Sequence, residues 1–235
     1  MRGFFVSATD TEVGKTAIAC GLARLLATRG HDVGVAKPVQ SGALATDPGG
    51  DAALLREAAG VDDELGEICP YAYAAPLAPL VASRLEGRPV DPKVVLDAVA
   101  ELARRHDVLL VEGAGGLLVP VGEDWMIADL AGWLGLPLVV VARAGLGTVN
   151  HTLLTLEAAR ARGLEVAAVV LNGRSPDSDA SADTNPELIA TFGRVGVMSV
   201  PRLASRPGRQ LAEGIAARLD SEPFLTSLQK EAASA

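Results

Sequence analysis

The stretch VSATDTEVGKT, residues 6–16, decides how this chain is interpreted. It follows the apolar run GFFVSA (3–8) and opens the helical pattern GKTAIACGLARLLATRG (14–30). A predicted strand therefore leads through it into a predicted helix. It ends in Gly14-Lys15-Thr16, as phosphate-binding loops do, although Thr9 stands where such a loop normally has its first glycine. The stretch predicts a phosphate-binding loop of unusual form.

The position of this loop explains the chemistry expected of it. Backbone N–H groups at a helix N-terminus are unpaired and attract anions, and the helix dipole adds to that attraction. Lys15 can reach the β- and γ-phosphates of a nucleotide, and the Thr16 hydroxyl can bind Mg²⁺. Gly14 lets the backbone approach the phosphates closely. The hydroxyls of Thr9 and Thr11 can add to the backbone amides.

The bulk composition predicts one α/β domain over residues 1–235, with about 221–235 as a frayed tail. Hydrophobic residues make up 49% and the formal net charge is −8. This composition allows a sizeable core and argues against a nucleic-acid partner. The cysteines, Cys20 and Cys69, lie in no metal or disulfide pattern, so a reducing compartment is expected. No apolar run is long enough to span a bilayer. We expect a soluble, cytoplasmic protein without a membrane partner.

Apolar runs typical of buried strands alternate with helical patterns along the chain. The predicted strands are 3–8, 32–38, 107–113, 137–143, 165–172 and 197–201. The predicted helices are 14–30, 51–60, 77–87, 91–106 and 148–163, and 173–185 is predicted to be a surface loop. Such alternation predicts an α/β fold, a three-layer α/β/α sandwich around a mostly parallel, doubly wound sheet.

Chemically useful side chains follow several of these strands. VAKPVQSG (35–42) offers Lys37, Gln40 and Ser41, GGDAALL (49–55) offers Asp51, and LLVEGAGGLLVP (109–120) offers Glu112 before a glycine-rich turn. In an open α/β sheet, ligands bind beyond the carboxyl ends of the strands. Each residue alone could be an ordinary surface charge or helix cap. Together they predict one site at that edge of the sheet.

The motifs identify a family resemblance that runs from about residue 3 to about residue 203. The chain closely resembles the ATP-dependent dethiobiotin synthetase family, whose sheet is of the P-loop NTPase type. The family motifs appear here as ATDTEVGKT (8–16), KPVQSG (37–42), VEGAGG (111–116) and GTVNHTLLT (147–155). In this family the first loop is longer than the common form, which explains its unusual form here. Ala8 replaces the family's first glycine.

The resemblance implies a reaction of biotin synthesis. Such an enzyme joins CO₂ to 7,8-diaminononanoate, closes a cyclic urea and converts ATP to ADP and phosphate. It implies Mg²⁺ as cofactor and Thr16, Asp51 and Glu112 as its protein ligands. It implies catalytic roles for Lys37, Lys15 and Thr11, with Lys37 on the carbamate and the γ-phosphate.

The resemblance also implies two larger sets of binding residues. ATP would be bound by Glu12, Val13, Gly14, Lys15, Thr16, Ala17, Asp51, Glu112, Gly113, Ala114, Gly115, Asn172, Gly173, Pro201, Arg202 and Leu203. The diamine would be bound by Ser41, Gly116, Leu117, Thr148, Val149, Asn150 and Asn185. The last four would act from the partner subunit of a homodimer, with the substrate's distal carboxylate at the N-terminus of the helix that begins near Thr148.

The main alternative is a partitioning or cell-division type of switch ATPase with the same nucleotide-binding fold. Those proteins carry a second lysine five residues before the loop lysine, whereas this chain has Asp10 there. A glutamine-dependent ligase would need a catalytic Cys and His that the sequence after His151 does not offer. A plain nucleotide-binding module would leave Lys37, Asp51 and Glu112 without a purpose.

Overall fold

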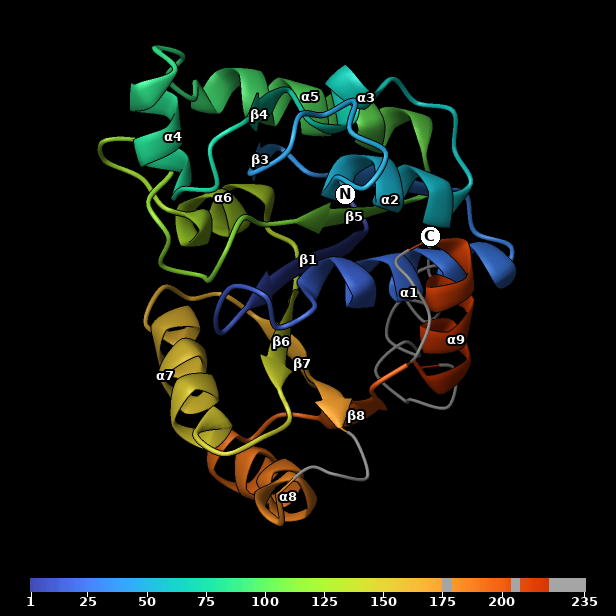
Figure 1. Ribbon diagram of the computed structural model, residues 1–235, viewed down its shortest axis with the longest axis vertical. Coiled ribbons are helices and arrows are strands. Elements are labelled where there is room, and N and C mark those ends of the chain that lie inside the picture. Colours follow the sequence, from blue (N-terminus) through green and yellow to red (C-terminus); the bar gives the residue numbers. More distant parts are fainter. Residues whose placement is uncertain (175–178, 204–207, 220–235) are drawn as a thin grey trace.

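The computed structural model describes residues 1–174, 179–203 and 208–219. A six-stranded sheet lies at its centre, and its order is β2-β5-β1-β6-β7-β8 (Figure 1). All neighbouring strands in it are parallel. The strands are β1 (Gly3–Ala8), β2 (Val33–Ala36), β5 (Val108–Glu112), β6 (Leu138–Arg143), β7 (Val166–Arg174) and β8 (Val197–Pro201). Because β1 lies between β5 and β6, the loop that follows it is near the middle of the sheet edge.

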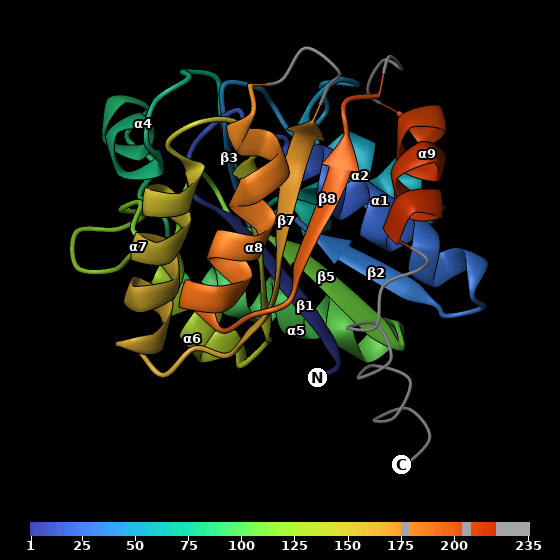
Figure 2. The same cartoon turned by 90° about the horizontal axis from the view of Figure 1, so that it is seen from below.

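Helices cover both faces of this sheet (Figure 2). One face packs against α1 (Lys15–Thr28), α2 (Asp51–Ala59) and α9 (Arg209–Leu219). The other packs against α5 (Pro92–Arg105), α6 (Ile127–Leu134), α7 (Thr148–Arg160) and α8 (Ser181–Gly193). Alternate residues of β1 enter opposite cores, Phe4 and Val6 on the α1 side and Phe5 on the α5 side. The predicted three-layer, doubly wound α/β fold is confirmed.

A smaller unit beyond β2 was not predicted. β3 (Val39–Ser41) and β4 (Tyr71–Tyr73) form a separate two-stranded parallel sheet beside α3 (Leu65–Ile68) and α4 (Pro79–Leu85). The strands are too short to show a clear period in the sequence. The buried Gln40 connects this unit to α2, because its Oε1 accepts from the Ala52 N–H at 3.1 Å. Its Nε2 donates to the carbonyls of Ala43 and Leu44. Gln40 thereby fixes the start of α2, where Asp51 lies.

The loop predicted over 173–185 is partly wrong. β7 continues to Arg174, and α8 already begins at Ser181. The Asp179 carboxylate accepts from the Ser181 N–H at 2.9 Å, as a capping side chain does. The Ser- and Asp-rich composition that suggested a loop thus includes a helix start. The sequence also missed α6 and α9, and the predicted tail at 221–235 lies outside the described residues.

Candidate active site

The loop between β1 and α1 has a backbone that explains its sequence. Ala8 is the last residue of β1, fully buried and extended, so position 8 does not require a glycine. Gly14, in contrast, has φ 86°, in the left-handed region that favours glycine. A Cβ on Gly14 would lie 2.0 Å from Nδ2 of Asn172, at the end of β7. That Nδ2 donates to the Val13 carbonyl at 2.9 Å, so Asn172 connects the loop to β7.

A buried charge cluster lies beside this loop, where β2 and β5 end. Nζ of Lys37 lies 2.6 Å from Oε1 of Glu112 and 2.7 Å from Oδ2 of Asp51. It also donates to the carbonyl of Gly113 at 3.1 Å. Lys37 and Glu112 are almost completely buried, at 2% and 1% exposure. β2 and β5 are neighbours, and this brings the two residues together as the sequence predicts.

Thr16 and Lys15 join the cluster from the first turn of α1. The Thr16 hydroxyl lies 2.8 Å from Oδ1 of Asp51 and 2.9 Å from Oε1 of Glu112. Nζ of Lys15 lies 4.0 Å from the same Glu112 oxygen. The other oxygen, Oε2 of Glu112, is buried without a hydrogen-bond partner. Such an atom is costly to bury unless a further cation or donor uses it.

The charges in this cluster shift the pKa values of its members. Burial, followed by the charge of Lys37, lowers the pKa of the Lys15 ammonium. Burial alone would also lower the pKa of Lys37, but the charges of Glu112 and Asp51 outweigh it and raise that pKa. Burial would raise the pKa of the Asp51 carboxyl, but the charge and hydrogen bond of Lys37 lower it. At neutral pH Lys37 is therefore an ammonium paired with carboxylates.

The cluster opens into a cavity of about 330 Å³, here called the phosphate cavity. Its lining contains predicted residues from separate segments of the chain. They are Thr11, Glu12, Gly14, Lys15, Thr16, Lys37, Ser41, Asp51, Ala114 and Gly115, together with Gln40. The loop and the segments that follow β2 and β5 thus border one polar space.

A second cavity of about 380 Å³, the base cavity, lies on the other side of the loop. It contains the predicted adenine-binding residues and several others. Its lining is Glu12, Val13, Gly14, Ala17, Arg143, Asn172, Gly173, Pro201, Arg202, Leu203, Leu211 and Ile215. Glu12 and Gly14 border both cavities, so one elongated ligand can extend from one to the other past the loop.

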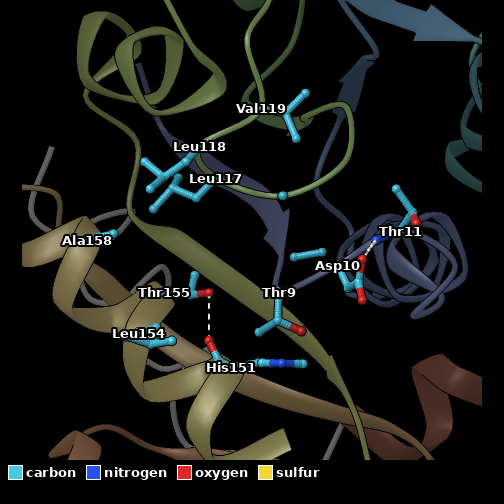
Figure 3. A pocket seen from close by; sticks show the side chains of 12 residues that line it. Thr9, Asp10, Thr11, Leu117, Leu118, Val119, His151, Leu154, Thr155 and Ala158 are labelled. Carbon is cyan, nitrogen blue, oxygen red and sulfur yellow. Dashed lines mark hydrogen bonds between the residues drawn. The ribbon is translucent and has the colours of Figure 1, made fainter. Parts of the chain in front are cut away.

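A third cavity of about 470 Å³, the chain cavity, lies between the turn at 116–119 and α7 (Figure 3). Figure 3 shows Leu117 and Leu118 on one side and His151 and Leu154 of α7 on the other. Thr11 lines both this cavity and the phosphate cavity. The polar loop therefore adjoins an apolar groove directly.

Comparison with known proteins identifies the family of this chain. A family model described as an AAA domain matches residues 2–207. The ATP-dependent dethiobiotin synthetase BioD of Anaeromyxobacter dehalogenans strain 2CP-C is 54% identical over 81% of this chain and 85% of its own. That of Bacillus licheniformis is 43% identical over 97% and 98%. This chain belongs to the ATP-dependent dethiobiotin synthetase family. The predicted family and enzyme class, an ATP-dependent ligase, are confirmed.

Solved structures show the fold and no more. The MinD cell division protein of Aquifex aeolicus aligns with TM-score 0.56 and 14% identity, over 94% of this chain and 98% of its own. A ParA family ATPase from Chlorobium tepidum TLS aligns with TM-score 0.53 and 13% identity, over 99% of both chains. These identities are too low to carry function, so the switch-ATPase alternative gains only the shared fold.

The predicted substrate residues of this synthetase fall into two groups. Gly116 and Leu117 line the chain cavity, and Ser41 lines the phosphate cavity. The others lie around the start of α7. Thr148 is fully buried, Val149 half-buried and Asn150 exposed, and Asn185 is buried in α8.

Asn185 is tied to its own chain. Its Nδ2 donates to the carbonyl of Ala144 at 2.8 Å and to that of Gly145 at 3.2 Å. In this arrangement Asn185 fixes the loop before α7, and its predicted contact with the diamine stays a prediction.

Sequence reasoning missed Arg143 as a functional candidate on a cavity wall. Arg143 ends β6 and lines the base cavity, where its guanidinium contacts Nδ1 of His151 at 3.3 Å. His151 itself lines the chain cavity. The position of Arg143 at a strand end was the available signal, since residues at strand ends form the site in such sheets.

The described residues bear on two predicted partners, the membrane and the metal ion. No helix within 1–174, 179–203 and 208–219 is long and apolar enough to cross a membrane. Across the same ranges, no group of three or more His, Cys, Asp or Glu residues could hold a metal ion. A metal at the charge cluster would therefore rest on two carboxylates and a hydroxyl.

Proposed function

We propose that this synthetase carboxylates 7,8-diaminononanoate with CO₂ and closes the ureido ring, converting ATP to ADP and phosphate. The observation that carries the proposal is the convergence of Lys15 and Lys37, which follow β1 and β2, on Glu112 at the end of β5. The two lysines border a polar cavity that adjoins both a base cavity and an apolar groove. Such a site can hold a nucleotide and an amphipathic chain against each other.

In the proposed reaction one amine of the substrate attacks CO₂ and loses a proton, which gives a carbamate. A carbamate oxygen then attacks the γ-phosphorus, and the bond to the leaving ADP oxygen breaks. The second amine attacks the carbamate carbon of this mixed anhydride, phosphate leaves, and a second proton is lost as the ring closes. Negative charge concentrates where the carbamate meets the γ-phosphate.

The lysines are the residues that would stabilise this charge. Lys15 would bind the β- and γ-phosphates from the first turn of α1. Lys37 follows a different strand, β2, and would bind the carbamate and the γ-phosphate in the same phosphate cavity. Thr11 would position the reacting groups where the phosphate and chain cavities meet, and Ser41 would hydrogen-bond the carbamate or an amine.

The charge cluster fits Mg²⁺. Mg²⁺ in nucleotide sites is held by one or two carboxylates with phosphate oxygens and waters, and Asp51, Glu112 and Thr16 offer that donor set. The buried, unpartnered Oε2 of Glu112 supports a further cation here. When bound, Mg²⁺ would supply positive charge to the β- and γ-phosphate oxygens.

The base cavity would bind adenine. Asn172 would present its amide to the edge of the base, and Gly173 leaves space beside it. Pro201, Arg202 and Leu203 would pack against the base from the end of β8. The triphosphate would then lie beside Glu12 to Ala17, and the turn of Gly113, Ala114 and Gly115 would lie next to the transferred phosphate.

The apolar part of the substrate would lie in the chain cavity, against Gly116 and Leu117. We propose a homodimer that completes this cavity, since Leu118 and Leu154 line it and are 46% and 56% exposed. The helix start at Thr148, Val149 and Asn150 has no side-chain cap, so its N–H groups can receive the substrate carboxylate in the partner subunit. We expect the enzyme to work in the cytoplasm.

The decisive experiment measures ADP release and product mass with ATP and Mg²⁺, in the presence and absence of the diamine and bicarbonate. We expect ADP release to depend on both substrates and the product mass to be that of dethiobiotin. ATP hydrolysis that does not respond to the diamine would instead support a switch ATPase.

A further inference from the structure

The ammonium of Lys37 lies where a metal ion in this site would need its ligands. It is 2.6 Å from Oε1 of Glu112 and 2.7 Å from Oδ2 of Asp51, so it bridges the two carboxylates. The Thr16 hydroxyl contacts the same Glu112 oxygen and the second Asp51 oxygen. Both oxygens of Asp51 and Oε1 of Glu112 are thus already in contact with Lys37 or Thr16, and only Oε2 of Glu112 has no partner. A Mg²⁺ that bound both carboxylates would lie beside the Lys37 ammonium, and the two cations would repel each other strongly.

We propose that Lys37 and the divalent cation compete for the carboxylates of Asp51 and Glu112, and that metal binding transfers the Lys37 ammonium to the phosphates. The inference rests on the metal site of the proposed function. Lys37 would thus have two successive partners, first the carboxylates and then the transferred phosphate and carbamate.

Because Glu112 is buried, its carboxylate needs a cation beside it both before and after metal binding. The Glu112 side chain is fully buried, and a buried carboxylate without a cation is strongly destabilising. Lys37 supplies the cation in the structure described here, at 3% side-chain exposure. A metal ion would supply it once Lys37 leaves, so Glu112 stays paired throughout.

The surroundings give the released ammonium a destination. Lys37 lines the phosphate cavity together with Lys15. Its remaining contact there is the Gly113 carbonyl at 3.1 Å, at the start of the glycine-rich turn. Phosphate oxygens delivered with the metal would replace the two carboxylates as its acceptors. Metal and nucleotide should therefore bind far better together than either does alone.

The test measures Mn²⁺ binding alone, without nucleotide, by the electron paramagnetic resonance signal of free Mn²⁺. Lys37→Met removes the bridging ammonium and keeps an unbranched side chain. Lys15→Met is the matched control, because it removes the same charge 4.0 Å from Glu112 without removing a bridge. We expect Lys37→Met to bind one Mn²⁺ at least about tenfold more tightly than wild type, or about 1.4 kcal/mol. The control should gain clearly less affinity than Lys37→Met, because the Lys15 ammonium lies 4.0 Å from Oε1 of Glu112 whereas that of Lys37 lies 2.6 Å from it.

The proposal is overturned if Lys37→Met binds Mn²⁺ no more tightly than wild type, or if Lys15→Met gains as much. Should Lys37→Met fail to fold by circular dichroism, Lys37→Gln keeps an N–H donor for Glu112 and allows the same comparison. A third arm uses wild type alone, by nuclear magnetic resonance of its lysine ammonium groups during a Mg²⁺ titration. We expect the buried Lys37 signal to shift as Mg²⁺ saturates, and an unchanged signal would also overturn the proposal.

This failure is distinguishable from failure of the proposed function. Wild type that forms dethiobiotin in a Mg²⁺-dependent way, while Lys37→Met shows no gain in Mn²⁺ affinity, would retain the function and remove the competition.

Discussion

Replacing Gly14 with alanine tests the structure of the phosphate-binding loop. Two separate costs follow from its geometry. The φ of 86° would place an alanine in the left-handed region, at about 1–2 kcal/mol. The new Cβ would also lie 2.0 Å from Nδ2 of Asn172 and force that side chain away from the Val13 carbonyl. Losing this hydrogen bond costs about 0.5–1.5 kcal/mol, so Gly14→Ala should destabilise the fold by roughly 1.5–3.5 kcal/mol.

A double-mutant cycle separates the two costs. In an Asn172→Ala background the steric conflict is absent, and Gly14→Ala should cost only the backbone strain. We therefore expect the double variant to be about 0.5–1.5 kcal/mol more stable than the sum of the single effects predicts. The gain from a less flexible unfolded chain is the same in both backgrounds and cancels. Urea unfolding of wild type, both single variants and the double variant measures the four free energies.

Gly30→Ala is the matched control in the same region. Gly30 has φ 89° and follows the other end of α1, but a Cβ there would meet nothing within 4 Å. Gly30→Ala should therefore show the strain alone, and less loss of stability than Gly14→Ala. Single effects that add to within about 0.3 kcal/mol in the cycle, or equal losses at Gly14 and Gly30, would refute the reasoning.

Further predictions concern catalysis, the metal, alkaline pH and the thiols. Lys37→Gln should lower kcat for dethiobiotin formation about 10²–10³-fold in steady-state assays and change ATP affinity much less. Lys37→Arg should not fully restore kcat. A loss of only a few-fold in kcat for Lys37→Gln would contradict the catalytic role of Lys37. Asp51→Asn should raise the Mg²⁺ concentration for half-maximal ADP release at least about tenfold, and an unchanged Mg²⁺ dependence would remove Asp51 from the metal site. Burial raises the pKa of Tyr73 to about 12, so its phenol contributes stability that is lost progressively as pH rises from about 10 to 12. Tyr73→Phe should flatten the urea-unfolding stability over that window, and an equally steep decline would contradict this. Burial raises the pKa of the Cys69 thiol to about 12, so iodoacetamide at neutral pH should label it only in unfolded protein, and labelling of the native protein would be the contrary result.

Sequence reasoning succeeded where strand order alone brings residues together. Lys37 and Glu112 lie at the ends of predicted strands, and any parallel sheet with β2 beside β5 places those ends together. The sequence could not predict which charged side chains form ion pairs with each other. The 2.6 Å contact between Lys37 and Glu112 depends on side-chain rotamers and burial, and neither has a sequence pattern.

The parts that were missed are short or lack periodicity. The sequence offered Gln40 as a candidate site residue, but no pattern showed that it orients α2 through the Ala52 N–H and so places Asp51. Its neighbours in β3 span only Val39–Ser41, too few for an alternating pattern. The base cavity is completed by Leu211 and Ile215 of α9, a helix that the sequence did not reveal. Residues at such positions become functional candidates only when the fold places them.

The likeness to MinD and ParA proteins shows how little of the chemistry the fold determines. A sheet of this kind fixes where the strand ends lie, and the residues at those ends decide what happens there. At position 10, where the partitioning ATPases carry their second lysine, this chain has Asp10, whose carboxylate accepts from the Thr11 N–H at 2.8 Å. This carboxylate shapes the loop at the mouth of the chain cavity and brings a negative charge, so it cannot act as a cation on phosphate. Under the proposed function, additional positive charge at the phosphates would come from Lys37, which follows β2 and lines the phosphate cavity together with Ser41. That difference in the origin of one charge is the structural reason to expect a ligase here and not a switch.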